Sequence, residues 1–167
     1  MPKPLTLRAL FATGAVLAAV VLLVPAAQAK SRSQFSTVKV GTRKVAKLGT
    51  ILVDSKGRTL YMFVPDKQRK VTCVATCAKI WPPLKLAAGA KATAGRGVKQ
   101  SLLGSDKNPA GGRVVTYNKW PLYTYVADTA PGKTKGQALN LNGGLWYVLS
   151  PSGKVIKTKP GGGGGYP

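Results

Sequence analysis

Two cysteines are the most reactive side chains of this 167-residue chain. Cys73 and Cys77 are spaced four positions apart, and one helical turn would bring their Cα atoms to about 6 Å, within reach of a disulfide. We predict this disulfide; because its loop is small, it adds only roughly 2 kcal/mol of stability. The alternative is a redox pair or a two-thiolate Cu(I) site. The C-x-x-x-C spacing differs from the C-x-x-C of thioredoxin-like redox proteins.

Other residues needed for common catalytic chemistry are missing. The chain has no histidine and no glutamate, and its four acidic residues are Asp54, Asp66, Asp106 and Asp128. Without histidine, neither a Ser-His-Asp nor a Cys-His nucleophile can form, and zinc has no imidazole ligand. So few carboxylates also disfavour a glycosidase pair or a hard-cation site. We therefore expect no catalytic residues, no metal site, no cofactor and no enzymatic activity.

One aromatic motif occurs twice, followed each time by a tryptophan. Both copies read Leu-Tyr-x-aromatic-x-x-Asp, after a β-branched run and a turn. The shared residues are Tyr61, Phe63, Asp66 and Trp81 in the first copy, and Tyr123, Tyr125, Asp128 and Trp146 in the second. Duplication of one strand-turn-strand unit explains the pattern.

We expect mainly structural roles for these motif residues. On a strand, Tyr61 and Phe63 share one face, as do Tyr123 and Tyr125, and both faces of each strand are apolar enough for burial. The rings would pack in the core; the alternative is an exposed aromatic platform that stacks a sugar, quinone or base.

Each motif aspartate would accept backbone N–H bonds from the turn that follows its strand. The alternatives are a carboxylate pair acting on a cation or proton, and ion pairs with nearby basic residues. Around Asp66 these basic residues are Arg58, Lys67, Arg69 and Lys70.

Turn residues predict three β-hairpins. The first joins 50–53 to 59–64 through Asp54–Gly57, the second joins 113–117 to 121–126 through Asn118-Lys119, and the third joins 146–149 to 154–157. One helical turn is expected over 75–80. The predicted fold class is all-β: a compact antiparallel β-sandwich or barrel of about seven to nine strands, built from two related hairpin-containing repeats.

Composition divides the chain into segments. Residues 1–29 have the basic start, 15-residue apolar run and Ala27-Gln28-Ala29 ending of a signal peptide cleaved after Ala29. We expect a flexible basic arm over 30–47, a β domain over 48–159 and a disordered glycine-rich tail over 160–167. Within the domain, repeat 1 covers about 49–86, a linker covers 87–111, and repeat 2 covers about 112–154. Export to the periplasm or cell surface supports the disulfide.

The charge is the strongest indicator of partners. The chain has 26 basic and four acidic residues, a net charge of +22. Loss of Lys3 and Arg8 with the signal peptide leaves 24 basic residues and a net charge of +20. This exceeds the roughly 2–8 charges that suffice for solubility. Anionic envelope polymers, lipid headgroups and non-specific nucleic acid are the expected partners, whereas no motif for sequence-specific DNA binding and no retained transmembrane segment is visible.

The repeated motif also resembles a known family. Tyr61-x-Phe63-x-x-Asp66 and Tyr123-x-Tyr125-x-x-Asp128 are similar to the Y-x-[FWY]-x-x-D motif of bacterial secreted and lipoprotein repeats of unknown function. The resemblance runs from about residue 48 to 153 and includes Cys73-x-x-x-Cys77 and Trp81-Pro82-Pro83-Leu84. It implies an exported β-rich module without an assigned activity or catalytic residues. The chain lacks a lipobox cysteine, and Lys119 stands where the family usually has glycine after Tyr-Asn.

Overall fold

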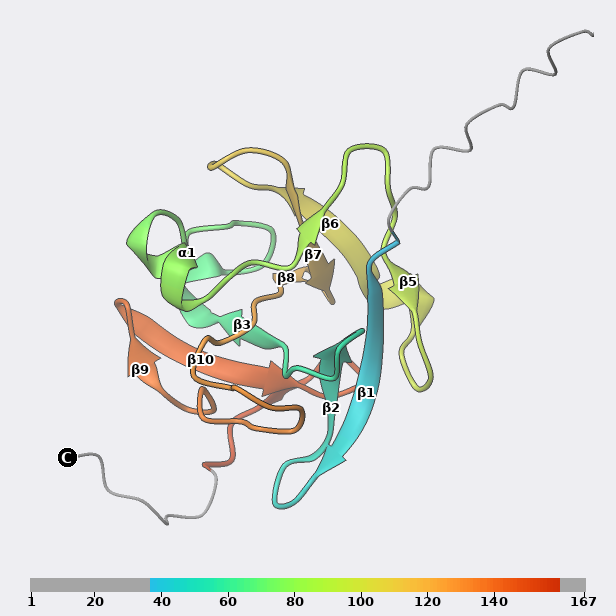
Figure 1. Cartoon of the computed structure of the whole chain (residues 1–167), viewed down its shortest axis with the longest axis vertical. Coiled ribbons are helices and arrows are strands. Elements are labelled where there is room, and N and C mark those ends of the chain that lie inside the picture. The colour runs from blue at the N-terminus through green and yellow to red at the C-terminus, as the bar shows by residue number, and fades with distance from the viewer. Residues whose placement is uncertain (1–36, 160–167) are drawn as a thin grey trace, which may run out of the picture. The chain divides into compact units, whose positions relative to one another are not determined.

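The computed structural model describes residues 37–159, and within this range it has eleven strands, one short α-helix and two 3-10 helices (Figure 1). The strands are β1 (Lys39–Val45), β2 (Gly49–Asp54), β3 (Tyr61–Phe63), β4 (Lys85–Leu86), β5 (Thr93–Ala94), β6 (Leu103–Lys107), β7 (Arg113–Tyr117), β8 (Trp120–Pro121), β9 (Asn140–Leu141), β10 (Gly144–Leu149) and β11 (Val155–Ile156). The helices are η1 (Val64–Asp66), α1 (Thr76–Ile80) and η2 (Gln100–Leu102). The predicted signal peptide and glycine-rich tail lie outside the described residues.

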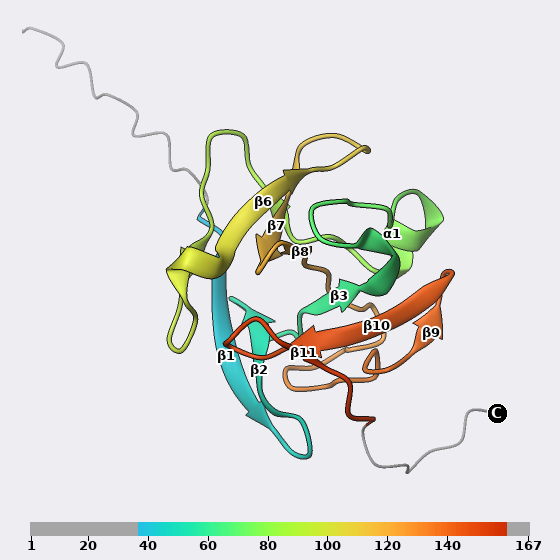
Figure 2. The same ribbon diagram turned by 180° about the vertical axis from the view of Figure 1, so that it is seen from behind.

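Three small sheets make up the described chain. Their orders are β2-β1-β5, β11-β10-β3 with β9 beside β10, and β4-β7-β6 with β8 beside β7. Every pairing is antiparallel except that of β1 with β5. The prediction of an all-β fold is confirmed, and over residues 37–159 the sheets form a sandwich-like arrangement rather than a closed barrel (Figures 1 and 2). The strand count exceeds the expected seven to nine because five of the strands are only two residues long.

The two repeats exchange strand partners. β3 of the first repeat pairs with β10 of the second, with Phe63 opposite Trp146. In return, Leu84 donates its N–H to Leu122 O at 2.8 Å and Thr124 donates to Pro82 O at 2.9 Å, so repeat 2 lies against repeat 1 in the same way. The motif tyrosines join the exchange: Tyr61 N bonds Tyr123 O at 2.8 Å, and Tyr123 N bonds Tyr61 O at 2.9 Å. The duplicated segments are therefore neighbours in space as well as copies in sequence.

The alternation of side chains divides the core in two. Leu60, Met62 and Leu122 belong to one buried cluster, while Tyr61 and Tyr123 belong to the other. This is the period-2 pattern expected of strands that are buried on both faces. The alternation ends at the same place in both repeats, where Val64 and Val126 are 42% and 55% exposed.

Two predicted connections contain strands. The flexible arm predicted over 30–47 is wrong for Lys39–Val45, which forms β1 and buries Val40 completely. The linker predicted over 87–111 is wrong for β5 and β6. The sequence did not indicate strand β6, because Leu-Gly-Ser-Asp-Lys has a single apolar residue. The strand lies at a sheet edge, where little of it needs to be apolar. β1 and β6 each form a hairpin with the strand that follows in the chain, β2 and β7, whereas β5 pairs with the distant β1.

The predicted hairpins are confirmed in part, and the predicted helical turn is present. The hairpin formed by β10 and β11 is confirmed, as is the helical turn, which is α1. The second hairpin forms between β7 and β8, but β8 covers only Trp120–Pro121 and not the predicted 121–126. The first hairpin is shorter than predicted. Its turn is closed by Gly57 N to Asp54 O and Asp54 N to Arg58 O, both 2.9 Å, but β3 then leaves β2 to pair with β10.

Candidate functional site

The centre of the molecule is built from two reciprocal tyrosine–aspartate hydrogen bonds. Tyr61 Oη donates to Asp128 Oδ2, and Tyr123 Oη donates to Asp66 Oδ2, each at 2.6 Å. All four residues are buried. Each repeat thus supplies the hydroxyl that its partner's carboxylate accepts, and we call these four residues the Tyr–Asp clasp.

The second oxygen of each clasp carboxylate anchors the loop that follows it. Asp66 Oδ1 accepts from both Thr72 N (2.7 Å) and Thr72 Oγ1 (2.6 Å), while Asp128 Oδ1 accepts from Lys135 N (2.8 Å). The expected capping role is met by donors six or seven residues downstream. Neither carboxylate forms an ion pair; in residues 37–159 the only ion pair joins Arg58 to Asp54, at 2.7 Å. The alternative of ion pairs between Asp66 and neighbouring cations is therefore wrong.

Burial sets the protonation behaviour of the clasp. Desolvation raises the pKa of Asp66 and of Asp128 above the usual value, while the hydrogen bonds that each carboxylate accepts oppose this rise. Burial, reinforced by the adjacent carboxylate, raises the pKa of Tyr61 and of Tyr123 far above the usual value. Both hydroxyls therefore remain protonated donors, which suits a fixed structural contact better than proton transfer.

A stack of four rings lies beside the clasp. Trp81 and Trp146 stack face to face with centroids 3.8 Å apart and an interplanar angle of 4°. Phe63 stacks on Trp146 and Tyr125 on Trp81, both at 4.1 Å, so each tryptophan is covered by a ring from the other repeat. Such pairs add about 0.5–1.5 kcal/mol each beyond the area that they bury.

This packing argues against the aromatic platform. Tyr61 and Tyr123 are fully buried, Phe63 is 3% exposed, and both stacked tryptophans are inaccessible, so their faces cannot stack a ligand. Tyr125 is half-buried, and one of its faces is taken by Trp81.

The cysteines and the carboxylates are likewise engaged in structure. Cys73 and Cys77 are joined in a disulfide with their Cα atoms 5.2 Å apart, as the spacing predicts, so their sulfurs are not the thiolates that Cu(I) requires. Asp66 and Asp128 bind tyrosines and loop amides rather than each other, so they do not form the carboxylate pair of a hydrolase.

Two further buried residues, Gly136 and Gln137, have structural roles that their residue types alone do not predict. Gly136 donates its N–H to Tyr61 Oη at 3.3 Å, and a Cβ there would lie 2.6 Å from the Trp81 indole, so only glycine fits. Gln137 is buried, accepts from Val148 N at 2.8 Å and donates to Ile156 O at 2.6 Å. A Gly-Gln pair carries no such meaning in sequence, because the residues that crowd it come from distant segments.

The charges of the described chain are separated between surface and interior. Every lysine and arginine from 37 to 159 is exposed. Asp54, Asp66 and Asp128 are buried, and Asp106 is partly buried. Since anions are almost absent from the outer surface, the positive field is barely compensated there.

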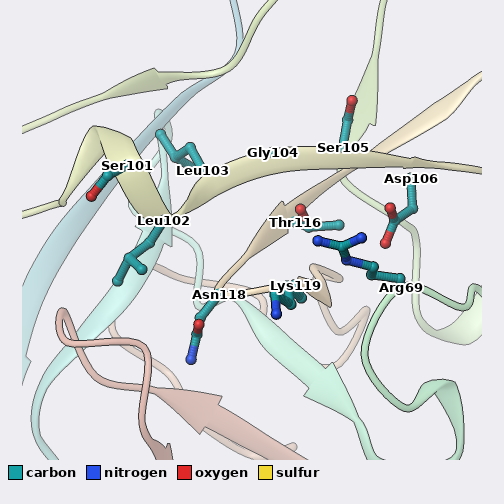
Figure 3. A pocket seen from close by; sticks show the side chains of 10 residues that line it. All are labelled: Arg69, Ser101, Leu102, Leu103, Gly104, Ser105, Asp106, Thr116, Asn118 and Lys119. Atoms are coloured by element: carbon teal, nitrogen blue, oxygen red, sulfur yellow. The ribbon is translucent and has the colours of Figure 1, made fainter.

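One polar pocket of about 410 Å³ opens on this cationic surface (Figure 3). It lies between β6, the β7–β8 turn and the loop that carries Arg69. Its lining includes Arg69 and Lys119 together with Asp106, a carboxylate that sequence reasoning assigned no role.

Taken together, the fold and these contacts define a disulfide-bonded, all-β module of two interlocked repeats with a cationic exterior. The family described as a secreted repeat of unknown function (Lipoprotein_15) matches this chain twice, over residues 42–85 and 104–150. The chain belongs to that family. The second match begins in β6, ahead of the start at about 112 predicted for repeat 2. No curated protein and no solved structure matches the chain.

The family's description bears on location as well. A secreted repeat agrees with an extracytoplasmic protein. Among the residues that the structure describes, no helix has the length and apolar character needed to cross a membrane.

Proposed function

We propose that this protein is an exported, non-enzymatic module that binds the anionic polymers or lipid headgroups of the cell envelope through its surface cations. The observation that carries the proposal is the separation of charge. All the basic side chains between 37 and 159 face solvent, while three of the four aspartates are buried and the fourth is half-covered.

An uncompensated positive surface attracts polyanions without requiring a shaped site. Such attraction extends about one Debye length, roughly 8–10 Å at physiological salt, and weakens as salt screens it. Nucleic acid would be bound by the same field, without reading of the base sequence. The module would then be held where negative charge is dense, at the envelope polymers that an exported protein meets first.

The fates of the carboxylates support a non-enzymatic role. Asp66 and Asp128 are bound by tyrosine hydroxyls, and Asp54 is bound by Arg58 and by the amides of its own turn. Asp106 alone has no such partner, and one carboxylate without histidine or glutamate makes a poor acid–base system. Export completes the proposal: cleavage after Ala29 would give a mature chain starting at Lys30, which N-terminal sequencing of secreted protein would reveal.

Salt-dependent retention tests the proposed function. The mature protein is applied to polygalacturonate beads and to neutral dextran beads, and eluted with salt rising from about 0.05 to about 0.5 M. We expect retention on the anionic beads alone, with the logarithm of the binding constant falling linearly with the logarithm of salt concentration. A Lys67→Gln/Lys70→Gln variant should show a shallower slope. Retention that ignores salt, or equal retention on neutral beads, contradicts the proposal.

A further inference from the structure

The pocket beside β6 holds an acid and a base that face each other without pairing. Figure 3 shows the Asp106 carboxylate and the Arg69 guanidinium pointing into the same space. Arg113 and Arg69 both attract Asp106 electrostatically, but neither forms an ion pair with it, and within the described chain no donor reaches Asp106 Oδ2, which is shielded from water. An acceptor left without a donor in this way is costly. The rest of Asp106 is only partly buried and the Arg69 side chain is exposed, so a third group in the pocket can contact both.

The backbone around the pocket is strained in a way that adds cations to its lining. Asn118 and Lys119 form the two-residue turn between β7 and β8 with φ angles of 47° and 68°, a conformation in which the second position favours glycine. Arg69 also has a positive φ, 71°, and its N–H bonds Lys119 O at 2.9 Å. Two basic side chains thus occupy left-handed positions that are joined to each other.

A glycine lines the pocket opposite Thr116. Gly104 lies in the middle of β6, is exposed and does not have the positive φ that would require glycine. A Cβ at this position would come within 2.9 Å of Thr116 Oγ1, a hydroxyl that lines the pocket. Glycine inside a strand often marks a place where a ligand approaches the backbone.

We propose that this pocket binds a hydroxyl-bearing anion of the sugar phosphate or uronate class, as one unit of the anionic polymer to which the protein binds. A sugar hydroxyl donates and accepts hydrogen bonds at once, so it can bridge Asp106 and Arg69 where neither a simple anion nor a simple cation could. The acidic group of the unit would meet Lys119, and the Thr116 hydroxyl supplies a further polar contact. The volume of about 410 Å³ lies in the range of small-ligand sites.

This inference rests on the proposed function for the source of the ligand, but its test is independent. The probes are galacturonate and glucose 6-phosphate, which combine hydroxyls with charge, and glucose and inorganic phosphate, which carry one feature each. Binding is followed by titration calorimetry and by shifts of backbone amide NMR signals. We expect the two combined probes to bind and to shift residues of β6 and the β7–β8 turn, with the single-feature probes at least about tenfold weaker.

Asp106→Ala is the most discriminating variant, because the positive surface field and the proposed contact in the pocket predict opposite changes in affinity for galacturonate. The substitution makes the protein more positive, so electrostatic attraction alone would tighten the binding of galacturonate. Loss of a charged hydrogen-bond acceptor would instead weaken it, by about tenfold or more. Weaker binding by a variant whose melting temperature is unchanged supports the pocket, while tighter or unaltered binding overturns it.

Lys119→Gly adds a matched comparison. Lys47→Gly is the same substitution at an exposed turn residue with nearly the same φ, 65°, away from the pocket. Both variants should remain folded and lose retention on polygalacturonate beads equally, whereas Lys119→Gly alone should weaken the monomeric probes. Equal effects on the monomers overturn the pocket while leaving the proposed function standing. Salt-independent retention on the beads would instead overturn the proposed function.

Discussion

Removal of one clasp hydroxyl tests the structural reasoning most directly. Tyr61→Phe deletes a single oxygen and leaves the fully buried ring in place. That oxygen donates to Asp128 Oδ2 at 2.6 Å and accepts from Gly136 N at 3.3 Å. The carboxylate would keep only the Lys135 amide, on its other oxygen, and its burial prevents water from replacing the lost donor.

The magnitude follows from the charge of the acceptor. A hydrogen bond to a charged group contributes about 1.5–3 kcal/mol, and the orphaned carboxylate places the loss near the upper end. We therefore expect Tyr61→Phe to lower the free energy of unfolding by about 2–3 kcal/mol, or to lower Tm by roughly 10 °C for a domain of this size. Tyr147→Phe is the matched control: its hydroxyl makes no hydrogen bond within the described chain, so the change should be under about 0.5 kcal/mol.

The loss of stability caused by Tyr61→Phe should also decrease as the pH falls. Burial raises the pKa of Asp128, and the Tyr61 hydroxyl opposes that rise, so its removal raises the folded-state pKa further. A protonated carboxyl group is neutral and loses less when its hydrogen-bond donor is removed. The destabilisation by Tyr61→Phe should therefore be largest near pH 7 and shrink towards about pH 4. Urea unfolding followed by tryptophan fluorescence measures both values. If Tyr61→Phe costs no more than Tyr147→Phe, or costs the same at both pH values, the clasp does not stabilise the fold as argued.

Three further outcomes follow from the same contacts. Burial raises the pKa of both clasp aspartates, so their protonation stabilises the fold fully below the usual aspartate pKa of about 4, and this stabilisation is lost as pH rises through the folded-state pKa. The urea midpoint should therefore be higher at about pH 4 than at pH 7. A lower midpoint at pH 4 contradicts this. The double variant Cys73→Ala/Cys77→Ala should remain folded and lose roughly 2 kcal/mol, since the disulfide closes a short loop; complete unfolding would assign it a larger role. Gly136→Ala should lower the free energy of unfolding by about 1–3 kcal/mol or more, because the new methyl group meets Trp81 at 2.6 Å. Gly41→Ala, whose methyl group would lie 3.8 Å from its nearest neighbour, should lower it far less. Equal losses in the two variants would show that the close packing at Gly136 does not matter.

The sequence predicts well what depends on local alternation. The period-2 spacing of Tyr61 and Phe63 is enough to place both rings on one buried face, and the repeated motif is enough to relate them to Tyr123 and Tyr125. The Cys-x-x-x-Cys spacing predicts the helical turn and its disulfide in the same way. The shared strand face and the disulfide depend on residues close together in the chain, whereas the contact between the two copies is long-range and is indicated only by the repeat.

What the sequence does not predict depends on long-range pairing. Nothing near Asp66 indicates that its hydroxyl donor would come from Tyr123, 57 positions away. Neighbouring cations are the better local guess, yet they remain in water because burying an ion pair costs more than burying a carboxylate that neutral donors satisfy. Strand β6 escaped prediction for a different reason. It pairs with the next strand, β7, but its Gly, Ser and Asp, which line the pocket, are residue types typical of a loop.

The clasp and the surface divide the charged residues between two tasks. Asp66 and Asp128 lie at equivalent positions of the two repeats and join them through the clasp. Their hydrogen-bond donors are neutral hydroxyls and amides. The cations outside then have few partners of their own, and nearly all are free to attract an anionic polymer. Changes to surface lysines should therefore alter binding without altering the fold. Asp106 is the exception, an acidic residue at the boundary that neither task explains, and this is the reason to look for a ligand beside it.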